Sequence, residues 1–178
     1  MSTRSQLRFV DSSRDWTDPV QVYRHSDGYP EGVLPALRKL RDVQNNTATL
    51  RGANYAAANF IFLCKLQGMT MYEDDGFSRN SIDQDDILDP EEWDVDQPHF
   101  LLGYGVESPS SGIHGDEEYL YIVDVGVPGW EVSVSKHGGF PSWEAADDLP
   151  DGETAFDHVE WQFDGISLDG AIEALVDE

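Results

Sequence analysis

The alternation of apolar and polar residues predicts short strands near both ends of the chain. Around residue 20, Val20 and Val22 fall on one face of an extended segment, and Gln21 and Tyr23 fall on the other. Similar runs, rich in aromatic and β-branched residues and bounded by turn residues, recur in the second half. The predicted strands cover residues 6–11, 20–23, 100–106, 119–125, 130–134 and 156–163.

Apolar residues at spacings of three and four predict helices between these strands. The first helix covers residues 33–43, with Pro35 in its first turn and Asn45-Asn46 after its end. Its predicted apolar stripe consists of Val33, Leu34, Leu37, Leu40 and Val43. The second helix covers residues 52–67, with Gly68 as its stop. It is apolar nearly all round, so we expect it to be central and buried. Ser167 can cap a last helix.

This order of elements, β-β-α-α-β-β-β-β-α, predicts a single α+β domain over residues 1–178. We expect a mainly antiparallel sheet of about five to six strands with two or three helices packed on one face. Residues 1–5 are expected to be frayed. Residues 70–97 are long, acidic and without a regular pattern, so we expect an acidic loop or insertion there.

The composition excludes several classes of protein. No run approaches the ~18 apolar residues of a membrane span, so no membrane partner is expected. The N-terminus lacks the apolar core of a signal peptide, which predicts a cytoplasmic protein. Cys64 is the only cysteine, so neither an internal disulfide nor a cysteine-based zinc site can form. We expect no cofactor.

The charge of the chain is extreme, with 35 acidic and 11 basic side chains and a net charge of −24. Molar salt screens such repulsion, so we interpret the composition as an adaptation to a halophilic cytoplasm, with loosely held cations on the acidic surface. Residues 1–69 nevertheless carry a net charge of +3. We expect this basic third to pair with the acidic remainder of the chain.

The densest set of special residues is the motif Tyr23-Arg24-His25-Ser26-Asp27-Gly28-Tyr29-Pro30-Glu31-Gly32. It resembles the start of a family of small uncharacterised phage and prophage proteins with a Tyr-Arg-His-x-Asp-Gly-Tyr-Pro motif. An apolar helix pair and an aromatic strand like Glu118-Tyr-Leu-Tyr-Ile-Val follow in that family. The resemblance covers about residues 20–136. It implies a viral or proviral origin, with this chain as a haloarchaeal member, and it implies no chemistry.

The same motif holds the candidate catalytic residues, His25 and Asp27. A carboxylate beside an imidazole fixes its tautomer and begins an acid–base pair. The other reading is a folding device, in which Asp27 bonds the turn backbone and His25 bonds a neighbouring strand. Tyr23, Arg24 and Tyr29 are candidates for ligand contacts. His114, in a glycine-flanked loop, is the best distant partner, and we hypothesise that it shares a site with His25. No metal site is predicted, because the histidines lack a ligand spacing.

Two functions remain open at this level. The first is a non-enzymatic binding or regulatory module that acts on a protein partner. The second is a small hydrolase with His25 as the base, Asp27 as its orienting residue, and Tyr29 or His114 in support. We do not expect a nucleic-acid partner, because only the basic side chains around the first helix could bind phosphate and the rest of the molecule repels it. These bases are Arg38, Lys39, Arg41 and Arg51.

Overall fold

The fold is built on a six-stranded sheet with the order β3-β2-β1-β4-β5-β6. The computed structural model describes residues 3–14, 17–74, 103–108, 110, 112–114, 117–136 and 155–176. The strands are β1 Ser5–Val10, β2 Val20–Arg24, β3 Tyr104–Glu107, β4 Tyr119–Asp124, β5 Glu131–Lys136 and β6 Phe163–Ser167. Strands β1 and β4 are parallel, and every other neighbouring pair is antiparallel. The predicted mainly antiparallel α+β domain is confirmed.

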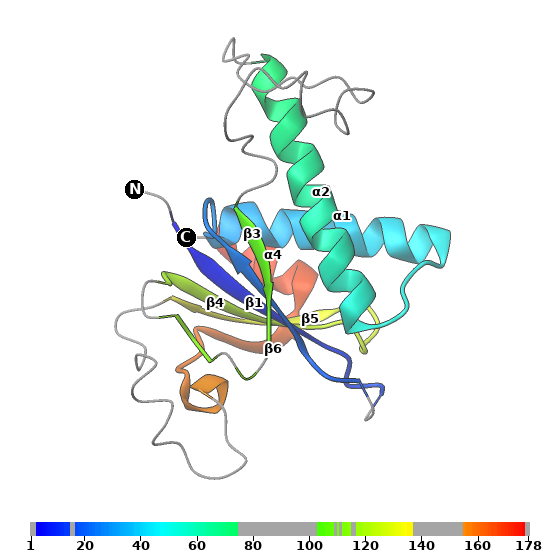
Figure 1. The fold of residues 1–178 in the computed structure, drawn as a ribbon. Coiled ribbons are helices and arrows are strands. Elements are labelled where there is room, and N and C mark those ends of the chain that lie inside the picture. The colour runs from blue at the N-terminus through cyan, green and yellow to red at the C-terminus, as the bar shows by residue number, and fades with distance from the viewer. Residues whose placement is uncertain are drawn as a thin grey trace.

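Three α-helices cover one face of this sheet (Figure 1). They are α1 Pro30–Thr47, α2 Ala53–Asp74 and α4 Leu168–Val176. Alternate strand residues such as Leu7, Val22 and Val134 point into this layer and are fully buried. The main core therefore lies between the sheet and the helices, as the period-2 pattern of the strands requires.

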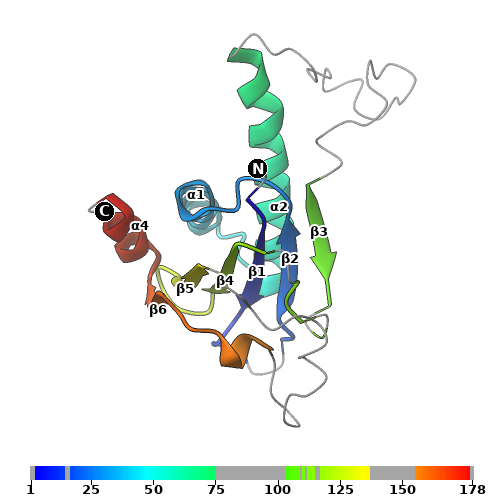
Figure 2. The same cartoon turned by 90° about the vertical axis from the view of Figure 1, so that its left-hand side faces the viewer.

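A smaller apolar cluster lies on the other face of the sheet. It contains Ile113, Leu120, Phe156 and Val159. The short 3-10 helix η4, Ala155–His158, contributes Phe156 and lies across the sheet from the three α-helices (Figures 1 and 2). Among the described residues, apolar side chains fill only part of this second face, and polar side chains occupy the part beside β3.

Helix α1 is longer than predicted at both ends. It begins at Pro30, which suits the first helical position, and it ends at Thr47, before Ala48 in the left-handed region at φ 52°. Pro35 therefore lies in the second turn, so our placement of it in the first turn is wrong. Val43 is half exposed and does not belong to the buried stripe. Gln44 is buried instead.

Helix α2 departs from the prediction in length and in burial. It continues through Gly68 to Asp74, because one interior glycine costs only about 1 kcal/mol relative to alanine. The first residues of the predicted acidic loop at 70–97 are therefore helical, and residues 75–97 lie outside the described part. Central burial is also wrong, because Phe62 on the outer side of α2 is 66% exposed. No helix in the described part is both long and apolar enough to cross a membrane.

Two further differences concern the ends of the chain. Ser5 already belongs to β1, and the carbonyl oxygens of Thr3 and Arg4 accept main-chain hydrogen bonds, so residues 3–5 are not frayed. In the predicted strand at 156–163, Phe156 and Val159 are three residues apart and are buried together, which suits the turn of η4. Strand β6 follows, and Ser167 caps α4 by accepting a hydrogen bond from the Gly170 N–H, as predicted.

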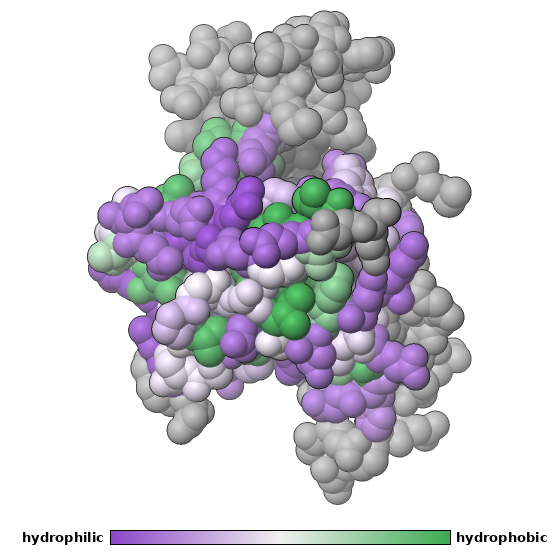
Figure 3. All heavy atoms as spheres, turned by 180° about the vertical axis from the view of Figure 1, so that it is seen from behind, coloured by the Kyte–Doolittle hydropathy of each residue, from purple (hydrophilic) through white to green (hydrophobic). Residues whose placement is uncertain are grey.

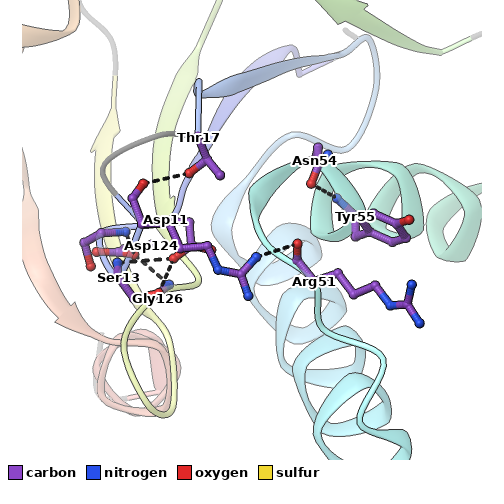
Figure 4. A network of polar contacts seen from close by, with 10 residues as sticks. Asp11, Ser13, Thr17, Arg51, Asn54, Tyr55, Asp124 and Gly126 are labelled. Carbon is purple, nitrogen blue, oxygen red and sulfur yellow. Dashed lines mark hydrogen bonds and ion pairs between the residues drawn. The ribbon is translucent and has the colours of Figure 1, made fainter.

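The loops at one end of the sheet are joined by a polar network (Figure 4). The Asp124 carboxylate accepts hydrogen bonds from the Ser12 and Gly126 N–H groups at 3.1 and 2.8 Å. Asp11 binds Ser13 and lies 3.4 Å from Arg14, whose guanidinium donates to the Arg51 carbonyl oxygen. These contacts tie the turns after β1 and β4 to the start of α2.

Candidate functional site

A cluster of polar side chains lies on the sheet face opposite the α-helices. Antiparallel register places Gln6 beside Tyr23 and Gln21 beside Glu107, so all four share this face. The loop at 112–114 lies over them. We call this set the Glu107–His114 cluster, and it consists of Gln6, Gln21, Tyr23, His25, Glu107 and His114.

The Glu107 carboxylate is the centre of the cluster. Its Oε2 accepts hydrogen bonds from the Nε2 groups of Gln6 and Gln21 at 2.7 and 3.1 Å. Its Oε1 lies 2.8 Å from His114 Nε2. Both glutamines are fully buried, and the Glu107 side chain is mostly buried. Such a carboxylate is held in one orientation by three donors from three parts of the chain.

The aromatic part of the cluster is more open to solvent. The Tyr23 ring lies 5.7 Å from the His114 ring and 6.1 Å from the His25 ring, between centroids. The Tyr23 hydroxyl is 3.0 Å from His25 Nδ1. Tyr23 thus contacts both His25 and His114, and the hypothesis that the two histidines share a site stays a prediction.

This arrangement brings a carboxylate, two imidazoles and a phenol together. With its proton on Nε2, facing Glu107, a neutral His114 has its lone pair on Nδ1, the form that a general base needs. The carboxylate that orients an imidazole is therefore Glu107 acting on His114. The sequence paired His25 with Asp27, but His25 Nδ1 lies within hydrogen-bond distance of the Tyr23 hydroxyl.

The other predicted residues lie elsewhere. Asp27 is exposed in the turn after β2, at φ 55°. Tyr104 lies on the helix-covered face, and burial is the main cause that raises its pKa. The negative charge of Asp27 makes a smaller contribution in the same direction. Arg24 is 8% exposed on that same face, with its guanidinium over the Tyr104 ring and its Nε donating to the Ser26 carbonyl. Tyr29 precedes α1 and is partly exposed.

The motif also has a clear structural role. The Gly28 N–H donates to the Thr3 carbonyl, and the Gly28 carbonyl accepts from the buried Tyr121 hydroxyl at 2.8 Å. A Cβ at Gly28 would lie 2.6 Å from Ser5 Oγ. The His25 N–H donates to the Gly103 carbonyl. The connection from β2 to α1 is thus held against β1 and β4.

Sequence reasoning missed Glu107, Gln6 and Gln21. Nothing near Glu107 in the chain signals its role, because its partners are far away in sequence and meet it only through strand register. The one available signal was a polar glutamine at each of two strand positions. Among the described residues, no group of three or more histidine, cysteine, aspartate or glutamate side chains is placed to hold a metal ion.

Comparisons with known proteins add no further assignment. No protein-family model matches the chain, and neither the curated proteins nor the solved structures contain a match. The resemblance to phage and prophage proteins therefore stays a prediction.

Proposed function

We propose that this protein is a non-enzymatic binding module that docks a protein partner on the outer side of α2. The observation that carries the proposal is that α2 is apolar on both sides, while the described part of the chain covers only one of them. The buried side, against the sheet and α1, consists of Ala53, Ala56, Ala57, Phe60 and Cys64. The resemblance described above supports a viral or proviral origin for such a module.

The uncovered side of α2 carries large apolar side chains at helical spacing. Tyr55, Phe62 and Leu66 are 46%, 66% and 37% exposed. Offsets of seven and four residues place them on one side of the helix, opposite the buried stripe. Helix α2 crosses α1, and its C-terminal half extends beyond the other elements (Figures 1 and 2). An exposed apolar side of this kind is typical of a protein interface.

The charge pattern supports the same surface. About one residue in five of the chain is acidic, yet no aspartate or glutamate occurs between Asp42 and Glu73. On the side of the molecule shown in Figure 3, by contrast, hydrophilic side chains dominate and the apolar ones form small separate groups. A protein that depends on acidic side chains for solubility in salt carries few of them on a surface that another protein covers, because charged residues are depleted at the centre of interfaces.

A pull-down in multimolar KCl with Phe62→Glu tests this proposal. Val43→Glu is the matched control, because Val43 is a half-exposed apolar residue on the neighbouring helix α1. We expect one protein to be retained by the wild type and by Val43→Glu, and to be lost with Phe62→Glu. Retention by all three proteins would contradict the proposal, and so would retention by none of them together with a wild type that stays monomeric in the same salt.

The geometry of His114 favours a second candidate function, a hydrolase. A carboxylate 2.8 Å from an imidazole is the orienting pair of many hydrolytic sites. In this reading His114 is the base, Glu107 orients it, and His25 and Tyr23 contact the substrate. Hydrolysis of p-nitrophenyl acetate by the wild type would fall at least tenfold in a folded His114→Asn variant. Equal rates in both proteins would exclude this use of His114.

A further inference from the structure

We infer that the partner on the outer side of α2 is a second copy of this chain, with the two α2 helices packed antiparallel across a two-fold axis. The inference rests on the proposed function, because it uses the same surface. It adds the identity of the occupant and the geometry of the contact.

The exposed stripe of α2 is complementary to itself. Along the helix it presents the large Tyr55, the small Ala58 and Asn59, and the large Phe62. If two such helices cross antiparallel at Ala58 and Asn59, Tyr55 of each copy meets Phe62 of the other. Small residues at the crossing point allow the close approach that helix packing requires. Two aromatic pairs then flank the axis, an isologous arrangement.

The charges at the contact permit this pairing in salt. Each copy carries −24, so two copies repel in dilute buffer. The Debye length falls from about 10 Å at 0.1 M salt to about 3 Å at 1 M, which removes most of that repulsion. The region between Asp42 and Glu73 brings no carboxylate to the contact. The Arg51 guanidinium lies 5.7 Å from the centroid of the Tyr55 ring, and Lys65 flanks the stripe, so the contact carries two basic groups per copy whose charges molar salt screens.

The size of the exposed stripe sets the expected strength of association. A standard interface buries about 800 Å² per partner, and three partly exposed side chains form only its centre. We therefore expect a reversible dimer with a dissociation constant of about 10 μM in 3 M KCl, weakened at least tenfold in 0.3 M KCl.

Sedimentation equilibrium in 3 M KCl at about 10 to 200 μM protein measures this association directly. The mass of the wild type and of Val43→Glu should rise from the monomer value of 19.9 kDa toward twice that value with concentration. Phe62→Glu should stay monomeric. A monomeric wild type at every concentration, or a Phe62→Glu variant that dimerises as well, would overturn the inference.

Oxidative cross-linking tests the position of the two-fold axis. A cysteine in place of Ala58 lies beside the axis, whereas a cysteine in place of Asn54, also exposed on α2, lies several residues away from it. The native Cys64 is buried, and burial raises the pKa of its thiol, so it competes little. We expect Ala58→Cys to form a covalent dimer at least tenfold faster than Asn54→Cys. Equal rates would reject the antiparallel crossing.

The two experiments separate this inference from the function on which it rests. If the wild type is monomeric in salt but retains a different protein through Phe62, the binding module stands and the second copy is excluded. If Phe62→Glu changes neither self-association nor the pull-down, both proposals fail.

Discussion

Gly28 is the residue at which the central motif has least freedom. A Cβ there would lie 2.6 and 2.7 Å from Ser5 Oγ and Cβ, and 2.9 Å from the Arg4 carbonyl carbon. We predict that Gly28→Ala lowers the free energy of unfolding by about 2 kcal/mol, because backbone must move to relieve the contact. Chemical denaturation at fixed high salt measures this change. Gly105→Ala is the control, since its Cβ has its nearest neighbour at 3.9 Å, and an equal loss there would refute the steric explanation.

Tyr121 contacts the same turn and makes the stability of the fold depend on pH. Burial is the main cause that raises the pKa of its phenol well above the ordinary value, and its hydroxyl donates to the Gly28 carbonyl. A phenol whose pKa is higher in the folded state than in the unfolded state favours folding as long as it is protonated in both states. This contribution is complete below the pKa of the unfolded state, near pH 10, and it is lost as the pH rises through the pKa of the folded state. The free energy of unfolding should therefore fall above about pH 10.

The variant Tyr121→Phe should change both parts of this behaviour. We expect it to cost about 1 kcal/mol at neutral pH, through the lost hydrogen bond, and to show a shallower loss of stability above pH 10. Denaturation curves between pH 7 and 11 give both quantities. Tyr29→Phe, at a partly exposed position, is the control for loss of a phenol hydroxyl and should cost less than about 0.5 kcal/mol at neutral pH. If the free energy of unfolding falls equally with pH in the wild type and in Tyr121→Phe, the loss of stability above pH 10 does not come from Tyr121.

At the scale of elements, α1 and α4 are joined by one buried arginine. Arg41 Nη1 and Nη2 donate to the two Asp169 oxygens at 2.8 and 3.1 Å, and Nη1 also donates to the Gly129 carbonyl. The bond to Asp169 is the main cause that raises the Arg41 pKa. We predict that Arg41→Gln costs about 2 kcal/mol in denaturant unfolding, because the buried guanidinium and its hydrogen bonds to Asp169 and the Gly129 carbonyl are lost. Lys39→Gln, at an exposed neighbouring position, should cost less than about 0.5 kcal/mol. Equal costs would show that Arg41 acts only through general charge.

The elements also show which features the sequence could predict. Period-2 and helical patterns give most of the order of elements, because they depend on which face each residue buries, but they place a strand at 156–163, where η4 precedes β6. The parallel pairing of β1 with β4 and the contact of Glu107 with His114 have no local pattern, because both depend on how distant segments align. The hypothesis that His25 and His114 share a site stays a prediction, and the sequence did not point to the Glu107 carboxylate between the sheet and the loop.

Helix α2 shows a limit of a different kind. Its sequence predicts a fully buried helix, and the described residues of the fold cover only one side of it. Both observations agree if the other side is buried in an assembly, because hydropathy reports the total burial of a residue, not whether its own chain supplies the cover. The expected pairing of the basic first third is also partial. Arg41 pairs with Asp169, while Arg38, Lys39 and Lys65 have no ion-pair partner in the part of the chain that is described.

For the whole molecule, net charge sets the conditions under which the fold is stable. With a net charge of −24, mutual repulsion of carboxylates opposes the compact state, and added salt weakens that repulsion. We predict that the melting temperature rises by about 10 °C between 0.2 and 2 M KCl, which corresponds to a few kcal/mol for a chain of this size. Calorimetry over this range of KCl concentrations measures the change.

A charge variant separates this effect from a general stabilisation by salt. Glu118, Glu160 and Glu173 are exposed, and none makes a side-chain hydrogen bond or ion pair within the described residues. Replacing all three by glutamine removes three negative charges with little change in packing. If repulsion is the cause, the variant reaches a given melting temperature at lower KCl, and its advantage over the wild type disappears at 2 M. If both proteins shift in parallel at every concentration, exclusion of salt from the apolar surface explains the stabilisation, and the charge of the chain serves solubility alone.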